Sequence, residues 1–159
     1  MYTDDCVIFA DDDFTIDDLC KSLLSNFLLK DEGDIEDFLG IHLTKSINPA
    51  DRSVTFTITQ PGLIDQILAD IGLIRDSDDS SPPHGKFIPA TEVLHPHPNA
   101  APFSASWNYH SVIGKLNFLM QNTHPDISFT IHTHAQYVNG PDQKHQDAVK
   151  YLCHYLLLT

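Results

Sequence analysis

The apolar residues of this chain change their spacing near position 60, and this change constrains the fold more than any other feature. Before it, Val54, Phe56 and Ile58 alternate with threonines, as in a β-strand with one apolar face. After it, Pro61 opens a stripe of apolar residues at helical spacing. The sequence therefore predicts an α+β fold, with strands confined to the N-terminal part and helices beyond Gly62.

Three further elements are expected before the change of period. Residues 6–10 are apolar and form a short run suited to a buried strand, and residues 38–43 indicate another strand. Between them, a helix capped by Thr15 carries leucines on one face and ends near Gly33. The sequence NPADRS at residues 48–53 predicts a hairpin before the alternating strand, which we expect over Val54–Thr59. The first sixty residues should thus run strand, helix, strand, strand.

Helices and one long connection are expected in the rest of the chain. Residues 76–102 have no hydrophobic period and are rich in Asp, Ser, Pro and His, which predicts a loop or linker. Helical patterns follow over residues 107–120, between Pro125 and Gly140, and from Asp142 to the last residue. The apolar face of the last helix should carry Ala148, Tyr151, Leu152, Tyr155 and Leu156.

The chain is strongly acidic, with 9 Lys and Arg against 22 Asp and Glu and a net charge of −13. This sign disfavours binding to nucleic acid by phosphate neutralisation alone, so such a role must rest on a local site. Its three cysteines form no Cys-x-x-Cys pair, which disfavours a disulfide framework or a zinc knuckle. No leader or membrane-spanning stretch is evident. We expect a soluble, intracellular protein, cytoplasmic or nuclear, without a membrane partner.

Two histidine pairs raise the question of a metal site. His95 and His97 lie in a Pro-rich stretch, and His132 and His134 lie about 200° apart around a predicted helix. Neither pair can clamp one ion in these geometries, so all four are expected to be solvated loop or surface residues. The acidic run DDDFTIDD lacks the Gly and the Glu of a calcium loop and is better explained as an acidic helix N-terminus.

The tetrad YTDD, at residues 2–5, places the carboxylates of Asp4 and Asp5 side by side. Adjacent carboxylates repel each other, and a nearby cation lowers the cost of ionising both. On a regular strand they point to opposite faces, and only a tight turn between strands lets them converge on one metal. Such a hairpin tip is a candidate Mg²⁺ anchor for phosphoryl transfer, the alternative being ordinary acidity in an Asp-rich chain.

Five spaced blocks, of which the tetrad is the first, resemble the C-terminal part of the reverse transcriptase of copia-type retrotransposons. YTDDCVIFA resembles the motif C hairpin of the palm, and FLLKDEGDIEDFLGIHL resembles the helix, turn and strand that follow it. ITQPGLIDQIL resembles the helix that opens the thumb, while YHSVIGKLNFLMQNTHPDISF and HQDAVKYLCHYL resemble the segments leading to the ribonuclease H domain. The resemblance implies palm over residues 1–60, a thumb helix and linker over 61–102, and a helical thumb or connection over 103–159.

The same resemblance implies roles for individual residues near the tetrad. Asp4 and Asp5 would help to hold catalytic Mg²⁺, and Tyr2 would pack near the primer terminus. Lys30 becomes a candidate proton donor to the departing pyrophosphate, with an ordinary lysine at a helix C-terminus as the alternative. The implied partners of the complete enzyme are an RNA or DNA template–primer and a deoxynucleoside triphosphate.

Gln60 and Lys115 would lie in thumb elements near the template–primer, with a surface polar role as the alternative for each. The chain also departs from the family pattern. No stretch resembles the aspartate-bearing motif A, the fingers or the first arm of the hairpin, and His124 and His154 stand where the family has Arg. The chain alone is therefore expected to be inactive and to bind nucleic acid weakly or not at all. A non-catalytic interaction fragment, an inert relic or a mis-drawn gene model are the other interpretations.

Overall fold

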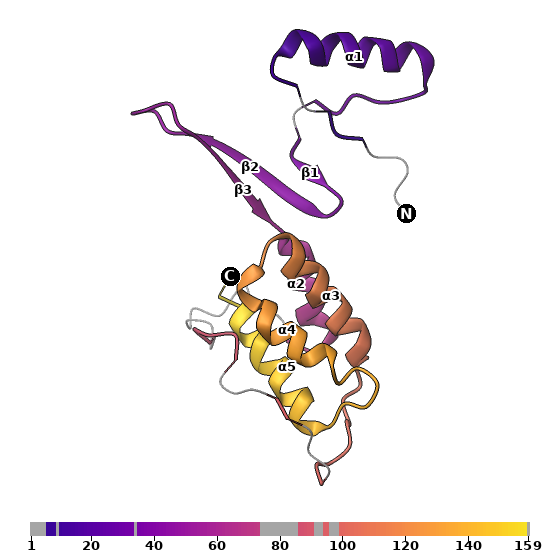
Figure 1. Ribbon diagram of the computed structural model, residues 1–159, viewed down its shortest axis with the longest axis vertical. Coiled ribbons are helices and arrows are strands. Elements are labelled where there is room, and N and C mark those ends of the chain that lie inside the picture. Colours follow the sequence, from indigo (N-terminus) through magenta and orange to yellow (C-terminus); the bar gives the residue numbers. More distant parts are fainter. Residues whose placement is uncertain are drawn as a thin grey trace. The chain divides into compact units, whose positions relative to one another are not determined.

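The computed structural model describes residues 6–8, 10–33, 35–73, 86–90, 94–95 and 99–158. Within them the chain combines helices with an antiparallel sheet, which confirms the expected α+β class (Figure 1). The chain divides into two compact units, Met1–Ile58 and Thr59–Thr159, called unit 1 and unit 2 below. Their assignment to palm and thumb stays a prediction. Among the described helices, none has the length and apolar character needed to cross a membrane.

The described part of unit 1 consists of one helix and a three-stranded sheet, with the last strand ending one residue into unit 2. Helix α1 spans Asp13–Asn26. The strands β1 (Asp37–Phe38), β2 (Ile41–Ile47) and β3 (Val54–Thr59) lie in the sheet in the order in which they occur along the chain. Consecutive strands are therefore joined by hairpins, as the short segments between them require.

Helix α1 begins and ends earlier than the sequence predicted. Asp12, rather than Thr15, is the N-cap, and its carboxylate accepts 2.8 Å hydrogen bonds from the backbone N–H and the hydroxyl of Thr15. These hydrogen bonds stabilise the charged form and lower the pKa of Asp12. The helix ends at Asn26, well before Gly33, because Phe27 adopts an extended backbone (φ −132°, ψ 149°).

The predicted strand over residues 38–43 is two strands in the structure. The chain reverses at Leu39 and Gly40, and Phe38 pairs with Ile41 across the resulting two-residue hairpin. Both turn residues have positive φ, 52° for Leu39 and 77° for Gly40, as a type I′ turn requires. Glycine adopts this conformation without cost, but leucine does not. The sequence pattern missed the turn because leucine is an unusual residue at such a position.

The second hairpin, between β2 and β3, confirms the turn predicted over residues 48–53. The backbone N–H of Asn48 donates to the carbonyl oxygen of Ser53 at 2.9 Å, and Arg52 donates back to Asn48 at the same distance. The Asn48 side chain also accepts a hydrogen bond from the backbone of Ala50 at 3.0 Å. Such side-chain acceptors stabilise turns in Asn-rich and Asp-rich loops. Strand β3 coincides with the predicted strand.

The strand predicted over residues 6–10 is not present in its described part. Cys6, Val7, Ile8 and Ala10 have no regular structure, and Cys6 is exposed. A strand needs a partner ladder, and none of the three described strands pairs with this segment. All described residues of unit 1 are at least partly exposed, including Phe14 of α1 and Phe56 of β3.

Unit 2 is a helical bundle that contains the hydrophobic core. Its helices are α2 (Pro61–Asp70), α3 (Tyr109–Asn122), α4 (Ser128–Ala135) and α5 (Gln143–Leu156), with a short 3-10 turn, η1, at Pro125–Ile127 (Figure 1). Helix α3 packs against α2 and α4, and α2 also contacts α5. The fully buried core side chains include Ile67, Leu68, Leu116, Leu119, Ile127, Ile131, Leu152 and Leu156.

Helices α2 and α5 begin where the sequence predicted. Pro61 is the first residue of α2, a position where its missing N–H has no helical partner to lose. Asp142 caps α5, accepting a 3.0 Å hydrogen bond from the backbone of His145, whose Nδ1 in turn accepts from the Asp142 backbone at 3.0 Å. This is a capping box in which histidine takes the place of the usual Glu or Gln.

The buried face of α5 is rotated from the predicted one. Leu152 and Leu156 are buried as expected, but Val149 and Cys153 complete the face, while Tyr151 and Tyr155 are only half-buried. The Tyr155 hydroxyl donates a 2.5 Å hydrogen bond to the exposed carboxylate of Asp126. This bond raises the pKa of Tyr155 to about 12, because the protonated phenol is the donor. The polar end of Tyr155 thus lies at the surface, which is why this residue is not part of the buried face of α5.

Candidate functional site

The residues predicted to form the metal site cannot be placed. Tyr2, Asp4 and Asp5 lie outside the described residues. Lys30, the candidate proton donor, lies beyond the last residue of α1 rather than in its last turn, so it is not the helix-terminal lysine of the alternative interpretation. Its ammonium group lies 2.8 Å and 2.9 Å from the two carboxylate oxygens of Glu32, and both side chains are highly exposed.

Gln60, one of the two predicted substrate-binding residues, is buried at the start of α2. Its side chain is 1% exposed, and its Oε1 accepts a 3.0 Å hydrogen bond from the hydroxyl of Thr123, the residue that follows α3. Its Nε2 is buried and has no hydrogen-bond partner among the described residues. Only one of the two polar groups of this buried amide therefore has a hydrogen-bond partner among the described residues.

Lys115, the other predicted substrate-binding residue, projects from α3 toward the end of α2. Its Nζ lies 2.8 Å from Oδ2 of Asp70, the last residue of α2, and both side chains are about one third exposed. Partly exposed ion pairs of this type contribute little to stability, about 1 kcal/mol or less.

Gln60 therefore lies at the start of α2, whereas Lys115 contacts the end of this helix from α3. The ten residues of the helix correspond to a length of about 15 Å, so the two side chains do not share one site. Two contacts hold α2 antiparallel to α3. The start of α2 is bonded to Thr123, just beyond the end of α3, and the end of α2 is paired with Lys115, farther back in α3. Both residues thus have a structural role in unit 2, and their contact with a template–primer stays a prediction.

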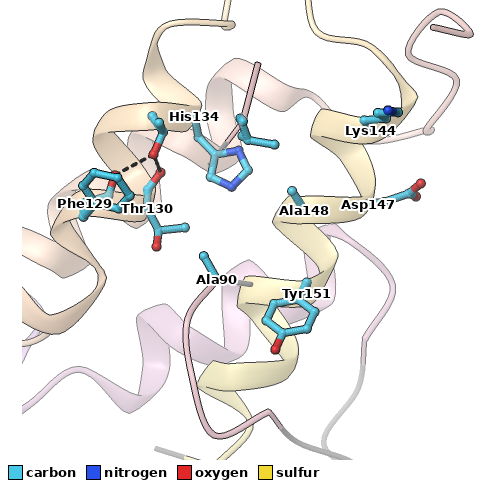
Figure 2. Close-up of a pocket in the computed structure, with 10 residues that line it drawn as sticks. Ala90, Phe129, Thr130, His134, Lys144, Asp147, Ala148 and Tyr151 are labelled. Carbon is cyan, nitrogen blue, oxygen red and sulfur yellow. Dashed lines mark hydrogen bonds between the residues drawn. The ribbon is translucent and has the colours of Figure 1, made fainter. Parts of the chain in front are cut away.

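Unit 2 also contains a pocket of about 300 Å³ that the sequence did not predict (Figure 2). Three walls form it: α4, α5 and the described part of the connection between α2 and α3. On each helix the lining residues recur at spacings that place them on one face. The lining residues are Ala90, Leu94, Phe129, Thr130, Thr133, His134, Lys144, Asp147, Ala148 and Tyr151.

Three contacts hold the connecting segment against the helices. The backbone N–H of Lys86 donates to the carbonyl oxygen of His154 on α5 at 3.1 Å, and its ammonium group lies 5.3 Å from the centre of the Tyr151 ring. Farther along, the hydroxyl of Tyr137 donates to the carbonyl oxygen of Leu94 at 3.4 Å. A charge over an aromatic face and two backbone contacts thus fix this wall of the pocket.

His134 is the polar group at the base of the pocket, and its burial corrects the predicted surface position. Its side chain is 1% exposed, and its Nδ1 lies 2.9 Å from the hydroxyl of Tyr109, which is also buried. Burial, with a smaller contribution from nearby His145, lowers the pKa of His134 to about 4. The imidazole is therefore neutral at pH 7. Its neighbour His132 is exposed, as expected.

A sequence signal for the burial of His134 did exist. His134 follows Ile127 by seven positions and Ile131 by three, which is the spacing of one apolar helix face. Both isoleucines are fully buried. Among the residues that the structure describes, no group of three or more His, Cys, Asp or Glu side chains could hold a metal ion.

Comparison with known proteins shows similarity to transposon polyproteins. The Retrovirus-related Pol polyprotein from transposon TNT 1-94 of Nicotiana tabacum is 24% identical over 156 residues, which cover 98% of this chain and 11% of that protein. The Retrovirus-related Pol polyprotein from transposon RE1 of Arabidopsis thaliana is 26% identical over 165 residues, covering 100% of this chain and 10% of that protein. The chain is similar to a segment of retrotransposon Pol polyproteins. No family model and no solved structure matches it.

The similarity to the Pol polyproteins extends over both structural units, because it covers 98% and 100% of the chain. The chain spans about a tenth of the length of these relatives. Unit 1 and unit 2 together are therefore similar to one stretch of a Pol polyprotein.

Proposed function

We propose that the chain is part of the RNA-directed DNA polymerase of a copia-type retrotransposon. One observation supports this proposal above the others: the chain is similar from end to end to retrotransposon Pol polyproteins. The resemblance of the YTDD tetrad and of the four sequence blocks that follow it supports a location in the second half of a polymerase palm and in the thumb. The described elements, helix α1 and three strands in unit 1 and helices in unit 2, support this assignment, but the strand expected over residues 6–10 is not among them.

In this proposal, Asp4 and Asp5 would hold Mg²⁺ through their carboxylate oxygens, the ligand type that this ion prefers. The chemistry supplied at these carboxylates would be activation of the attacking primer hydroxyl and stabilisation of the leaving pyrophosphate by the bound Mg²⁺. Tyr2 would pack beside the primer terminus. Lys30 would donate a proton to pyrophosphate, for which its ammonium group must leave the exposed carboxylate of Glu32.

Gln60 and Lys115 would serve the template–primer differently. Lys115 is partly exposed, so its ammonium group can exchange the carboxylate of Asp70 for a phosphate oxygen. Gln60 is buried, so its contribution would be to hold α2 against α3 in the thumb.

The 159 residues alone should not polymerise DNA. A two-metal centre needs a carboxylate beyond the adjacent pair, and the chain contains no stretch that resembles motif A. Primer extension on an RNA template with Mg²⁺ tests this point. Synthesis by the purified chain above that of the Asp4→Asn variant would contradict the expectation.

A chimera tests the polymerase assignment itself. The chain replaces the aligned segment of the RE1 Pol polyprotein, and primer extension is measured with the intact chimera. We expect activity that is lost in Asp4→Asn and Asp5→Asn but retained in the matched surface variant Asp11→Asn. A folded chimera that is inactive, or one whose activity does not depend on Asp4 and Asp5, would refute the assignment.

A non-catalytic interaction fragment is the second candidate, and the exposed apolar side chains of unit 1 favour it. Phe14, Phe27 and Phe56 are 80%, 62% and 56% exposed. Exposed aromatic side chains of this size offer apolar contact area to another protein. Under this alternative the chain binds neither Mg²⁺ nor a template–primer in calorimetry but retains a protein partner through unit 1.

A further inference from the structure

The pocket between α4 and α5 has the composition of a small-molecule site. Small side chains, Ala90 and Ala148, create its space, and the aromatic rings of Phe129 and Tyr151 border it. Figure 2 shows the imidazole of His134 pointing into the space between Thr130, Ala90 and Ala148. A volume of about 300 Å³ lies at the lower end of the range for small-molecule pockets, which suits one ring system.

Hydrogen bonding at the base of the pocket defines which polar group a ligand must offer. The Tyr109 hydroxyl lies 2.9 Å from Nδ1 of His134 and 3.4 Å from the His134 carbonyl oxygen. For this inference we assign the hydroxyl proton to the shorter of the two contacts, the one with Nδ1, so that the neutral ring carries its own proton on Nε2. No described residue accepts a hydrogen bond from Nε2. The pocket therefore presents an N–H donor without a positive charge.

The other polar groups restrict the ligand further. The Thr133 hydroxyl donates to the carbonyl oxygens of Phe129 and Thr130, at 2.6 Å and 3.0 Å, so its proton is engaged within α4. At the rim, Lys144 and Asp147 carry opposite charges, and Asp147 already accepts a 3.0 Å hydrogen bond from Gln143. These two charges cancel, so the rim does not select an anion or a cation.

We propose that this pocket binds a small, uncharged, planar aromatic molecule that carries a hydrogen-bond acceptor. The ring lies between the methyl groups of Ala90 and Ala148, and the acceptor takes the proton of His134 Nε2. The aromatic neighbours favour a flat ring, which stacks or packs edge to face against them. This site is separate from the polymerase chemistry proposed above and does not depend on it.

Methyl 4-fluorobenzoate is a suitable probe, because it is flat, uncharged and carries an ester carbonyl but no donor. Binding is followed by ¹⁹F NMR, with 1-fluoro-4-propylbenzene as a ligand of similar size that lacks the carbonyl. The ester should bind about three- to tenfold more tightly, the effect of one neutral hydrogen bond. Equal affinity for the two ligands would contradict the role of His134 as donor.

The location is tested on the unmodified chain and on one pair of variants. In the unmodified chain, the probe should shift the methyl resonances of Ala90 and Ala148 and the ring resonances of His134. In Ala148→Leu, the larger side chain fills the pocket and binding should weaken at least about tenfold. The matched variant Ala135→Leu places the same side chain at an exposed position of α4 and should leave binding unchanged.

Besides equal affinity for the two ligands, three further outcomes would overturn the proposal. They are the absence of binding to the unmodified chain, shifts confined to residues outside the pocket, and undiminished binding by Ala148→Leu. If Ala148→Leu does not fold, as judged by circular dichroism, the shifts in the unmodified chain decide the question alone.

Discussion

The hydroxyl of Tyr109 lies 2.9 Å from Nδ1 of His134, and both side chains are buried in unit 2. Removal of the hydroxyl in Tyr109→Phe leaves Nδ1 without a partner in an apolar environment. We expect the free energy of unfolding of unit 2 to fall by about 1–3 kcal/mol. Trp107 is the single tryptophan of the chain and stacks on Tyr109, so its fluorescence reports this unfolding in a urea titration.

Tyr151→Phe is the matched control for this variant. It also removes a phenolic hydroxyl from unit 2, but no described residue bonds to that hydroxyl, and the ring contact with Lys86 is retained. The free energy of unfolding of unit 2 should change by no more than about 0.5 kcal/mol in this variant. Equal effects of the two substitutions would show that the Tyr109–His134 contact does not stabilise the fold.

The stability of unit 2 should decrease as the pH falls from 6.5 to 4. His134 has a folded-state pKa of about 4 and an ordinary value of 6.5, so the unfolded chain takes up its proton first. The stabilisation is complete above pH 6.5 and is lost progressively toward pH 4, by about 3 kcal/mol in total. Urea titrations at several pH values measure this change.

Two variants isolate the contribution of His134 to the pH dependence. His134→Gln removes the titrating group and should flatten the profile between pH 6.5 and 4. His132→Gln removes an exposed histidine of the same helix and should leave the profile unchanged. An unchanged profile in His134→Gln would assign the pH dependence to other groups.

The contact between Gln60 and Thr123 should show strong coupling. Thr123→Val leaves the buried amide of Gln60 with no partner among the described residues, at a cost of about 1–3 kcal/mol. Gln60→Met alone removes the amide, and the double variant removes both polar groups. We expect the double variant to recover most of the stability lost in Thr123→Val, as measured by urea denaturation. Additive losses would indicate that the two side chains act independently.

The turn at Leu39 offers a stabilising substitution. Leu39 has a φ of 52°, a conformation that costs a leucine roughly 1–2 kcal/mol and that asparagine tolerates. Leu39→Asn should therefore slow hydrogen exchange of the Leu43 amide, which donates to Glu36 at 2.7 Å, by about fivefold. Leu29→Asn changes another exposed leucine without positive φ and should have no such effect.

Elements with a local sequence signal could be predicted, and those that depend on long-range packing could not. The alternation of Val54, Phe56 and Ile58 located β3, and Pro61 located the start of α2. The start of α1 was misplaced because Thr15 and Asp12 are both good caps, and Asp12 is the one with an extended backbone. Composition alone does not decide between them.

The candidate pocket could not be predicted, because its walls are far apart in the sequence. Ala90, Thr130 and Ala148 meet only through the packing of α4, α5 and a connection without periodicity. The hydrogen bond between His134 and Tyr109 is equally non-local, because 25 residues separate the two. For Asp4 and Asp5 the situation is the opposite. Their predicted roles come from sequence resemblance alone, because the described residues do not include them.

Helix α2 is attached to the remainder of unit 2 by contacts across long stretches of chain. The bond between Gln60 and Thr123 spans 63 residues, and the pair Lys115–Asp70 spans 45. Helices α3 and α4, in contrast, are close neighbours along the chain. Closing a longer loop costs more conformational entropy, and non-local contacts slow folding. We therefore expect α3 and α4 to pair first during refolding, and α2 to dock in the slower, rate-limiting phase.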